Sequence, residues 1–117
     1  MPSDKIDILQ GTLDLLVLQT LATMGAMHGY GIARRIEQTG GEDVLLNQGT
    51  IYASLVRLQQ KKWISANWGT SENNRKAKFY AITLRGEEQL EVETENWARM
   101  ANVVRRILNA KPEPDAS

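Results

Sequence analysis

The chain has 117 residues, of which 42% are hydrophobic and 24% are charged, and this composition fits one compact domain with a small core. It has no cysteine and one histidine, so disulfide bonds, thiol catalysis and zinc sites with thiolate ligands are excluded. A catalytic triad or a multi-histidine metal site would need more than one chain or a carboxylate-only arrangement. We therefore expect no metal, no cofactor and no enzymatic activity.

The formal net charge is zero, but basic and acidic side chains are segregated along the sequence. Between residues 29 and 85, nine basic side chains stand against four acidic ones. The segment GEEQLEVETE that follows holds five glutamates and no basic residue. One part of the chain is therefore suited to an anionic partner, and the next part is not.

The amino-terminus, MPSDKIDILQG, lacks the basic start and apolar run of a secretory signal. The longest apolar cluster, LDLLVLQTLA, is interrupted by Asp14, Gln19 and Thr20 and is shorter than the roughly 20 residues that span a bilayer. The sequence thus predicts a soluble, cytoplasmic protein.

Two amphipathic helices are predicted first. Apolar residues recur at three- and four-residue steps at Leu9, Leu13, Leu16, Val17, Leu21 and Met24. This spacing predicts a helix over about residues 12–24, ended by Gly25. In HGYGIARRIEQTGG, apolar side chains again share one face, so a second helix is predicted from Tyr30 to the Gly40–Gly41 pair, with His28 as a turn residue before it.

A third helix is predicted over about residues 48–62, after EDVLL, which is read as a short strand or a loop. Ile51, Leu55 and Leu58 form its buried face, at the spacing of one helical stripe. The opposite face is polar, and we expect it to be exposed. Its members are Thr50, Ser54, Arg57 and Lys61.

Two β-prone segments, WISANW and KFYAIT, follow and predict a hairpin. A polar loop over residues 69–74 joins them, and Arg75 and Lys76 lie at its far end. Trp63 and Tyr80 are expected in the core of this hairpin. A polar tip is ordinary for an exposed turn, so its cations alone do not decide between solvation and binding.

A long last helix is predicted to begin after Thr83, a suitable N-cap, because Glu87 and Glu88 then complement the positive end of its dipole. The tail KPEPDAS has two prolines and is expected to be disordered. The fold class is therefore mainly α with a small β-hairpin. The expected domains are a winged helix-turn-helix over residues 1–83, a dimerisation helix over residues 84–110 and a tail over residues 111–117.

In a winged helix-turn-helix protein, the third helix enters the major groove of DNA and the hairpin lies along the backbone. The cations of the hairpin would then meet phosphates or reach into a minor groove. The polar face of the third helix would contact bases or phosphates. The candidate DNA-binding residues are Tyr30, Gln48, Thr50, Tyr52, Ser54, Arg57, Lys61, Arg75, Lys76 and Lys78.

Four motifs, GTLDLLVLQTL, MHGYGIARRI, GTIYASLVRLQQKKWI and ENNRKAKFYAITLRGEEQL, occur in an order that resembles the PadR family of bacterial transcriptional regulators, particularly the type common in Acidobacteria. The resemblance covers about residues 9–108 and implies a homodimeric repressor with a partly palindromic operator, often released by a small effector. It further implies that residues 49–55 open the recognition helix with Tyr52 near DNA, and that the helix starting at Tyr30 holds a phosphate at its amino end. Ala53 stands where many members have proline, which puts any borrowed base preference in doubt.

The last helix carries an apolar stripe at heptad spacing, interrupted by Glu93. Its members are Leu90, Trp97, Met100, Ala101, Val104, Ile107 and Leu108. Little of the chain remains to cover such a stripe, so a second copy is favoured over packing within one chain. Trp97 is read first as an apolar anchor of that interface, and second as a surface on which a flat aromatic effector stacks.

Two other functions stay open from the sequence alone. A winged-helix module could bind protein through the same hairpin and third helix, and it would show no steep salt dependence with DNA. An enzyme would need a carboxylate pair such as Asp14 with Glu37, which the pattern does not bring together. RNA is a variant of the DNA hypothesis that lacks support, because no exposed aromatic surface of the single-strand type is predicted.

Overall fold

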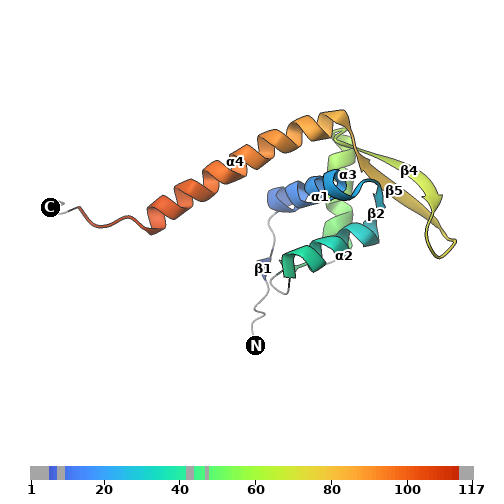
Figure 1. The fold of residues 1–117 in the computed structure, drawn as a ribbon, viewed down its shortest axis with the longest axis horizontal. Coiled ribbons are helices and arrows are strands. Elements are labelled where there is room, and N and C mark those ends of the chain that lie inside the picture. Colours follow the sequence, from blue (N-terminus) through green and yellow to red (C-terminus); the bar gives the residue numbers. More distant parts are fainter. Residues whose placement is uncertain (1–5, 8–9, 42–43, 47, 114–117) are drawn as a thin grey trace.

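The computed structural model describes residues 6–7, 10–41, 44–46 and 48–113. Within these residues, four helices and five strands follow one another (Figure 1). Their bounds are β1 (Ile6–Asp7), α1 (Gln10–Met24), β2 (Met27–His28), α2 (Gly29–Gly40), β3 (Val44–Leu45), α3 (Gln48–Gln60), β4 (Ile64–Thr70), β5 (Lys76–Ile82) and α4 (Leu84–Leu108). The predicted order of three helices, a hairpin and a long helix is confirmed.

The core lies where α1, α2 and α3 meet the base of the hairpin. The apolar stripe of α1 supplies four buried side chains, because they recur every three or four residues on one side of the helix. The predicted apolar faces of α2 and α3 pack against this stripe. The buried apolar residues are Leu13, Val17, Leu18, Leu21, Ile32, Ile36, Ile51, Leu55, Leu58, Ile64 and Tyr80. Tyr80 is therefore in the core as predicted, whereas Trp63 is half-buried at its edge.

The hairpin β4–β5, which we call the wing, belongs to a three-stranded antiparallel sheet of order β2-β5-β4. Its strands are longer than the sequence predicted, since Gly69 pairs with Ala77 and Thr70 with Lys76. The turn is therefore confined to residues 71–75 and is closed by a hydrogen bond from Ser71 N to Arg75 O of 2.8 Å. The expected loop over residues 69–74 was thus placed too early.

The third strand, β2, was not predicted. Met27 pairs with Tyr80 and His28 with Phe79, so the two residues before α2 extend the sheet that forms the wing. Because β2 has only two residues, it leaves no alternating pattern in the sequence. A second short pairing, parallel, joins Ile6 to Val44 and Asp7 to Leu45.

The end of α3 is joined to the start of α4 by a compact set of hydrogen bonds around Thr83. The Thr83 hydroxyl donates to the carbonyl of Lys62 (2.8 Å) and accepts from the backbone N–H of Gly86 (3.0 Å), while Thr83 N donates to the carbonyl of Trp63 (2.9 Å). The predicted N-cap is confirmed. The same residue is hydrogen-bonded to the turn that follows α3.

The 25-residue helix α4 packs against α1 at its start and then leaves the domain on the side away from the wing (Figure 1). None of the helices in the described ranges is both long and apolar enough to cross a membrane. Of the tail predicted to be disordered, residues 114–117 lie outside the described residues.

Candidate nucleic-acid interface

An open groove of about 550 Å³ lies between the amino ends of α2 and α3 and the wing. We call it the wing groove. Its walls come from three elements distant in sequence, and its defining residues are Tyr30, Ile51, Tyr52, Trp68, Lys78 and Tyr80, with Arg75 and Lys76 at its outer end. Five of the predicted DNA-binding residues are thereby brought to one concave surface.

The floor of the wing groove is apolar and its rim is aromatic. Ile51 and Tyr80 are buried, whereas Tyr52 is 62% exposed and Trp68 is 67% exposed. Burial, and then the neighbouring Tyr52, raise the pKa of Tyr80 above its ordinary value. Exposed aromatic rings beside a buried floor provide flat surfaces against which a sugar or base can pack, so the expectation that no such aromatic surface is exposed was wrong.

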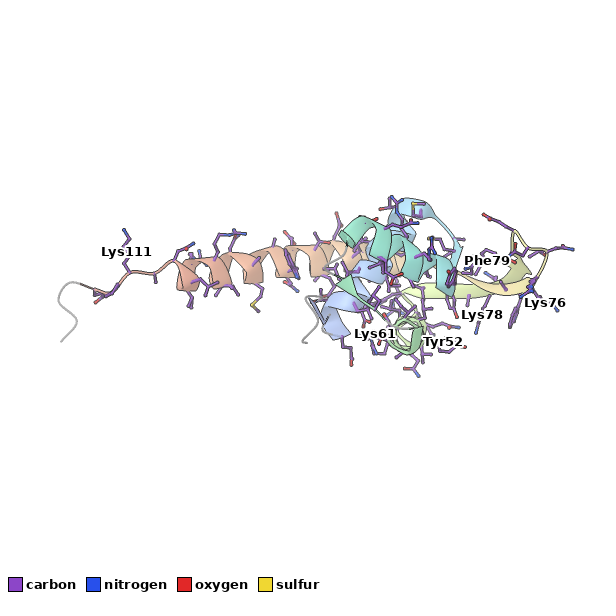
Figure 2. All side chains as sticks on the ribbon, turned by 90° about the horizontal axis from the view of Figure 1, so that it is seen from below. Tyr52, Lys61, Lys76, Lys78, Phe79 and Lys111 are labelled. Atoms are coloured by element: carbon purple, nitrogen blue, oxygen red, sulfur yellow. The ribbon has the colours of Figure 1, made fainter. Side chains whose placement is uncertain are left out.

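The cationic wall of the wing groove is formed by β5 and the turn before it. Arg75 and Lys76 are exposed and Lys78 is half-buried. Figure 2 shows Lys76 toward the outer end of the wing and Lys78 nearer α3, where Tyr52 lies. Throughout the described part of the chain, none of these three cations forms an ion pair, so no described carboxylate neutralises their charge.

At the amino end of α2, His28 is an N-cap. Its Nδ1 accepts a hydrogen bond from the backbone N–H of Gly31 (3.0 Å), and its ring meets Phe79 of the wing edge-on, with centroids 5.8 Å apart. The predicted turn residue therefore joins α2 to the sheet. Tyr30 is exposed beside it, with the Arg34 guanidinium carbon 5.9 Å from its ring centroid. Of the amide groups expected to hold a phosphate, that of Gly31 is already occupied by His28.

The polar face of α3 is not the exposed surface that the sequence predicted. Ser54 is fully buried, and its hydroxyl donates to Asp14 Oδ1 at 2.6 Å. Arg57, with 23% of its side chain exposed, is bound by both oxygens of the same carboxylate. The expected exposure is therefore wrong for Ser54 and only partly right for Arg57. The reason is that this polar stripe faces α1, where Asp14 supplies a polar partner inside the domain.

The solvent-facing side of α3 is formed instead by Gly49, Tyr52, Ala53, Val56, Gln59 and Gln60. These positions are three or four apart, so the signal was present in the sequence, but Val56 and Ala53 carry no polar group that would have indicated exposure. Thr50 is half-buried and Lys61 is exposed, with its Nζ 4.6 Å from the ring centroid of Trp63. The helix begins at Gln48, whose side chain lies outside the described atoms.

On α4, the predicted apolar stripe divides into two parts. Leu90 packs against the core of its own domain and Ala101 is half-buried, whereas Trp97 is 54% exposed. Beyond Trp97 the large apolar side chains are all exposed, up to 78% for Leu108. They are Met100, Val103, Val104, Ile107 and Leu108. A shallow groove of about 300 Å³ lies beside Trp97, between α4 and the first turns of α1.

Comparison with known proteins agrees with this geometry. The model of the transcriptional regulator PadR-like family matches residues 17–92. The chain is similar to a PadR-like transcriptional regulator of Bacillus cereus (28% identity, TM-score 0.74, covering 88% of this chain and 97% of that one). It is also similar to a transcriptional regulator from Clostridium thermocellum (25% identity, TM-score 0.75, covering 83% and 93%). An uncharacterized protein of Lysinibacillus sphaericus is 29% identical over 100 residues, which are 86% of this chain and 91% of that protein.

Proposed function

Because the chain belongs to the PadR-like family of transcriptional regulators, whose members bind DNA, generally dimerise and are not enzymes, we propose that it is a homodimeric repressor that binds a partly palindromic operator. In this proposal, α3 is the recognition helix and the wing contacts the DNA backbone. The observation that carries it is the wing groove, where exposed aromatic rings, and cations without an ion pair among the described residues, adjoin the amino end of α3.

Each part of the wing groove suits a different part of DNA. Arg75, Lys76 and Lys78 supply the positive charge that phosphates require, and release of counterions would make binding steeply dependent on salt. Tyr52 projects from the exposed side of α3, where it would contact base edges or the backbone in the major groove. We leave Ser54 out of this contact surface because it has no exposed atom to offer.

The second copy would dock on the exposed stripe of α4. The first half of this helix is acidic, with Glu87, Glu88, Glu91, Glu93 and Glu95, and the second half is basic, with Arg99, Arg105 and Arg106. Two such helices running antiparallel would place each acidic half against a basic half, around the apolar side chains of Trp97 and Val104. The two-fold axis of that pair would match the symmetry of a palindromic site.

The proposal also includes a site for a small effector beside Trp97. Trp97 borders the groove between α4 and α1, and its half-exposed ring offers a flat surface for an aromatic ligand. In the dimer this ring is first an interface anchor. If a ligand binds there, it quenches tryptophan fluorescence, and Trp97→Phe abolishes the quenching although Trp63 and Trp68 still emit.

The test is selection of duplexes from a random double-stranded library, followed by fluorescence anisotropy with the selected duplex and a scrambled one at several salt concentrations. We expect a preference of about a thousandfold or more for the selected duplex, with affinity that falls steeply as salt rises. Equal, weak binding to both duplexes would remove sequence specificity from the proposal. No binding at low salt would indicate a winged-helix module that binds protein.

A further inference from the structure

The carboxylate of Asp14 is the centre of a polar cluster inside an otherwise apolar helix contact. It lies on α1 between buried leucine and valine residues, and only 11% of its side chain is exposed. Three hydrogen bonds reach it from α3. They come from Ser54 Oγ to Oδ1 (2.6 Å), Arg57 Nη2 to Oδ1 (2.6 Å) and Arg57 Nε to Oδ2 (3.1 Å).

The hydrogen bonds of this cluster depend on the orientation of α3 relative to α1, whereas the surrounding apolar contacts depend on it much less. Apolar packing between two helices tolerates small rotations and shifts, whereas a guanidinium that binds a carboxylate through two nitrogens fixes both the distance and the plane of the pair. The hydrogen bond with Asp14 raises the pKa of Arg57, so the guanidinium stays charged. It is the one ion pair within the described residues, and a buried pair of this kind specifies geometry more readily than it adds stability.

The cluster lies on the buried side of α3, opposite the exposed side of the same helix. Ser54 and Arg57 face α1, while Tyr52 and Val56 on the same two turns face solvent. Rotating α3 about its axis would therefore break the bonds to Asp14 and displace Tyr52 together.

We infer that Asp14 is a positioning residue for DNA recognition, which fixes the rotation of α3 through Ser54 and Arg57, and that Arg57 serves this bond instead of contacting DNA. This inference rests on the proposed function. Arg57 could have either of two roles, and the affinity for DNA distinguishes them. If Arg57 positions α3, neutralising Asp14 lowers the affinity; if Arg57 binds a phosphate, neutralising Asp14 raises it.

The experiment compares Asp14→Asn, Arg57→Gln and the double variant with the wild-type chain, using the selected and scrambled duplexes. The asparagine keeps the shape of Asp14 but removes its charge and one acceptor. We expect each single variant to lose at least tenfold in affinity for the selected duplex, with little change for the scrambled duplex and the same salt slope. The double variant is expected to lose no more than the single ones, because all three break one bond network.

The opposite result would overturn the inference. If Arg57 contacts a phosphate, Asp14→Asn frees its charge and strengthens binding to both duplexes, whereas Arg57→Gln lowers the salt slope by about one. Two further variants separate positioning from stability. Val17→Ala truncates a buried side chain on the same helix and leaves the cluster intact, so it should keep the sequence preference. Ser54→Ala removes one of the three bonds and should lose part of that preference.

All variants are measured at a temperature where circular dichroism shows them folded. If Asp14→Asn fails to fold, Ser54→Ala and Arg57→Gln are compared with the wild-type chain in its place. A wild-type preference for the selected duplex in both variants would refute the positioning role. If the wild-type chain selects no duplex, the proposed function fails and the inference with it. If the wild-type chain is selective and the variants are equally selective, only the inference fails.

Discussion

Gly86, in the first turn of α4, lies directly against the backbone carbonyl oxygen of Trp63. A β-carbon at position 86 would occupy the space of that oxygen and would also press on the side chain of Ile82. Backbone atoms cannot move aside as a flexible side chain does, so glycine is required where the first turn of α4 meets the turn that follows α3. This contact holds the start of α4 close to Trp63 and Ile82.

The first prediction is that Gly86→Ala destabilises the protein by about 1–3 kcal/mol or more, because overpacking forces the start of α4 away from Trp63. Urea unfolding followed by circular dichroism measures this change. The matched control is Gly11→Ala in α1, where a β-carbon meets no atom within 4 Å. It should leave the free energy of unfolding unchanged or raise it by up to about 1 kcal/mol. Equal effects at both positions would contradict the close contact.

The second prediction concerns the wing cations. Lys76→Ala and Lys78→Ala should each lower the dependence of log K on log salt by about 0.9 for every phosphate that the variant no longer neutralises, for specific and scrambled DNA alike. Anisotropy titrations at four or more salt concentrations give this slope. Lys111→Ala removes the same charge at the far end of the molecule, beyond α4 (Figure 2), and should leave the slope unchanged. A similar decrease in all three variants would mean that net charge, and not the wing, governs binding.

The third prediction concerns stability at alkaline pH. Burial raises the pKa of Tyr80 in the folded protein above its unfolded value of about 10. The neutral phenol is therefore favoured by folding, and its contribution is complete below about pH 10 and is lost as the pH rises through the folded pKa. Urea unfolding between pH 8 and pH 11 should show stability falling less steeply in Tyr80→Phe than in the wild-type chain. An equally steep fall in both proteins would contradict the effect of burial on the Tyr80 phenol.

The fourth prediction tests the dimer. Val104→Glu places a charge within the exposed apolar stripe of α4, so it should raise the dissociation constant of the dimer at least tenfold, or about 1.4 kcal/mol. Sedimentation equilibrium measures this constant. Asn102→Glu adds the same charge on the other side of α4 and should dimerise normally. If Val104→Glu is a monomer and still binds the selected duplex with wild-type affinity, the proposal that the protein binds DNA as a dimer is refuted.

Periodicity predicted the fold well because each helix has one apolar side that the core must cover. Leu13 and Leu55 illustrate this, since their three- and four-residue spacing marked the buried faces of α1 and α3 correctly. The hairpin was found because its strands are rich in aromatic and β-branched residues. The two residues of β2 were missed, because so short a strand is defined only by its partner, Phe79 with Tyr80, and not by any local pattern.

The candidate site was predicted less well, and the failure has a single physical cause. A polar stripe on a helix is ordinarily exposed, but on α3 it faces a neighbouring carboxylate. Asp14 appeared in the sequence only as an interruption of an apolar run, and nothing local connects it to Ser54 and Arg57, which lie 40 and 43 residues away. Such pairings are visible only once α1 and α3 are packed together. Tyr52 was named from the family resemblance; it is exposed on α3, and its contact with DNA stays a prediction.

The pairing of β2 with β5 has a consequence for the entropy of binding. It braces the base of the wing at Phe79 and Tyr80 and ties it to the residue that caps α2. The separation between Tyr30 and Lys78 is therefore set by backbone hydrogen bonds before a ligand arrives, and little conformational freedom remains to be lost there. Within the described residues, the outer wing around Arg75 has no third strand beside it. The conformational entropy lost on binding is therefore mainly that of the wing tip, whereas the base of the wing is already rigid before binding.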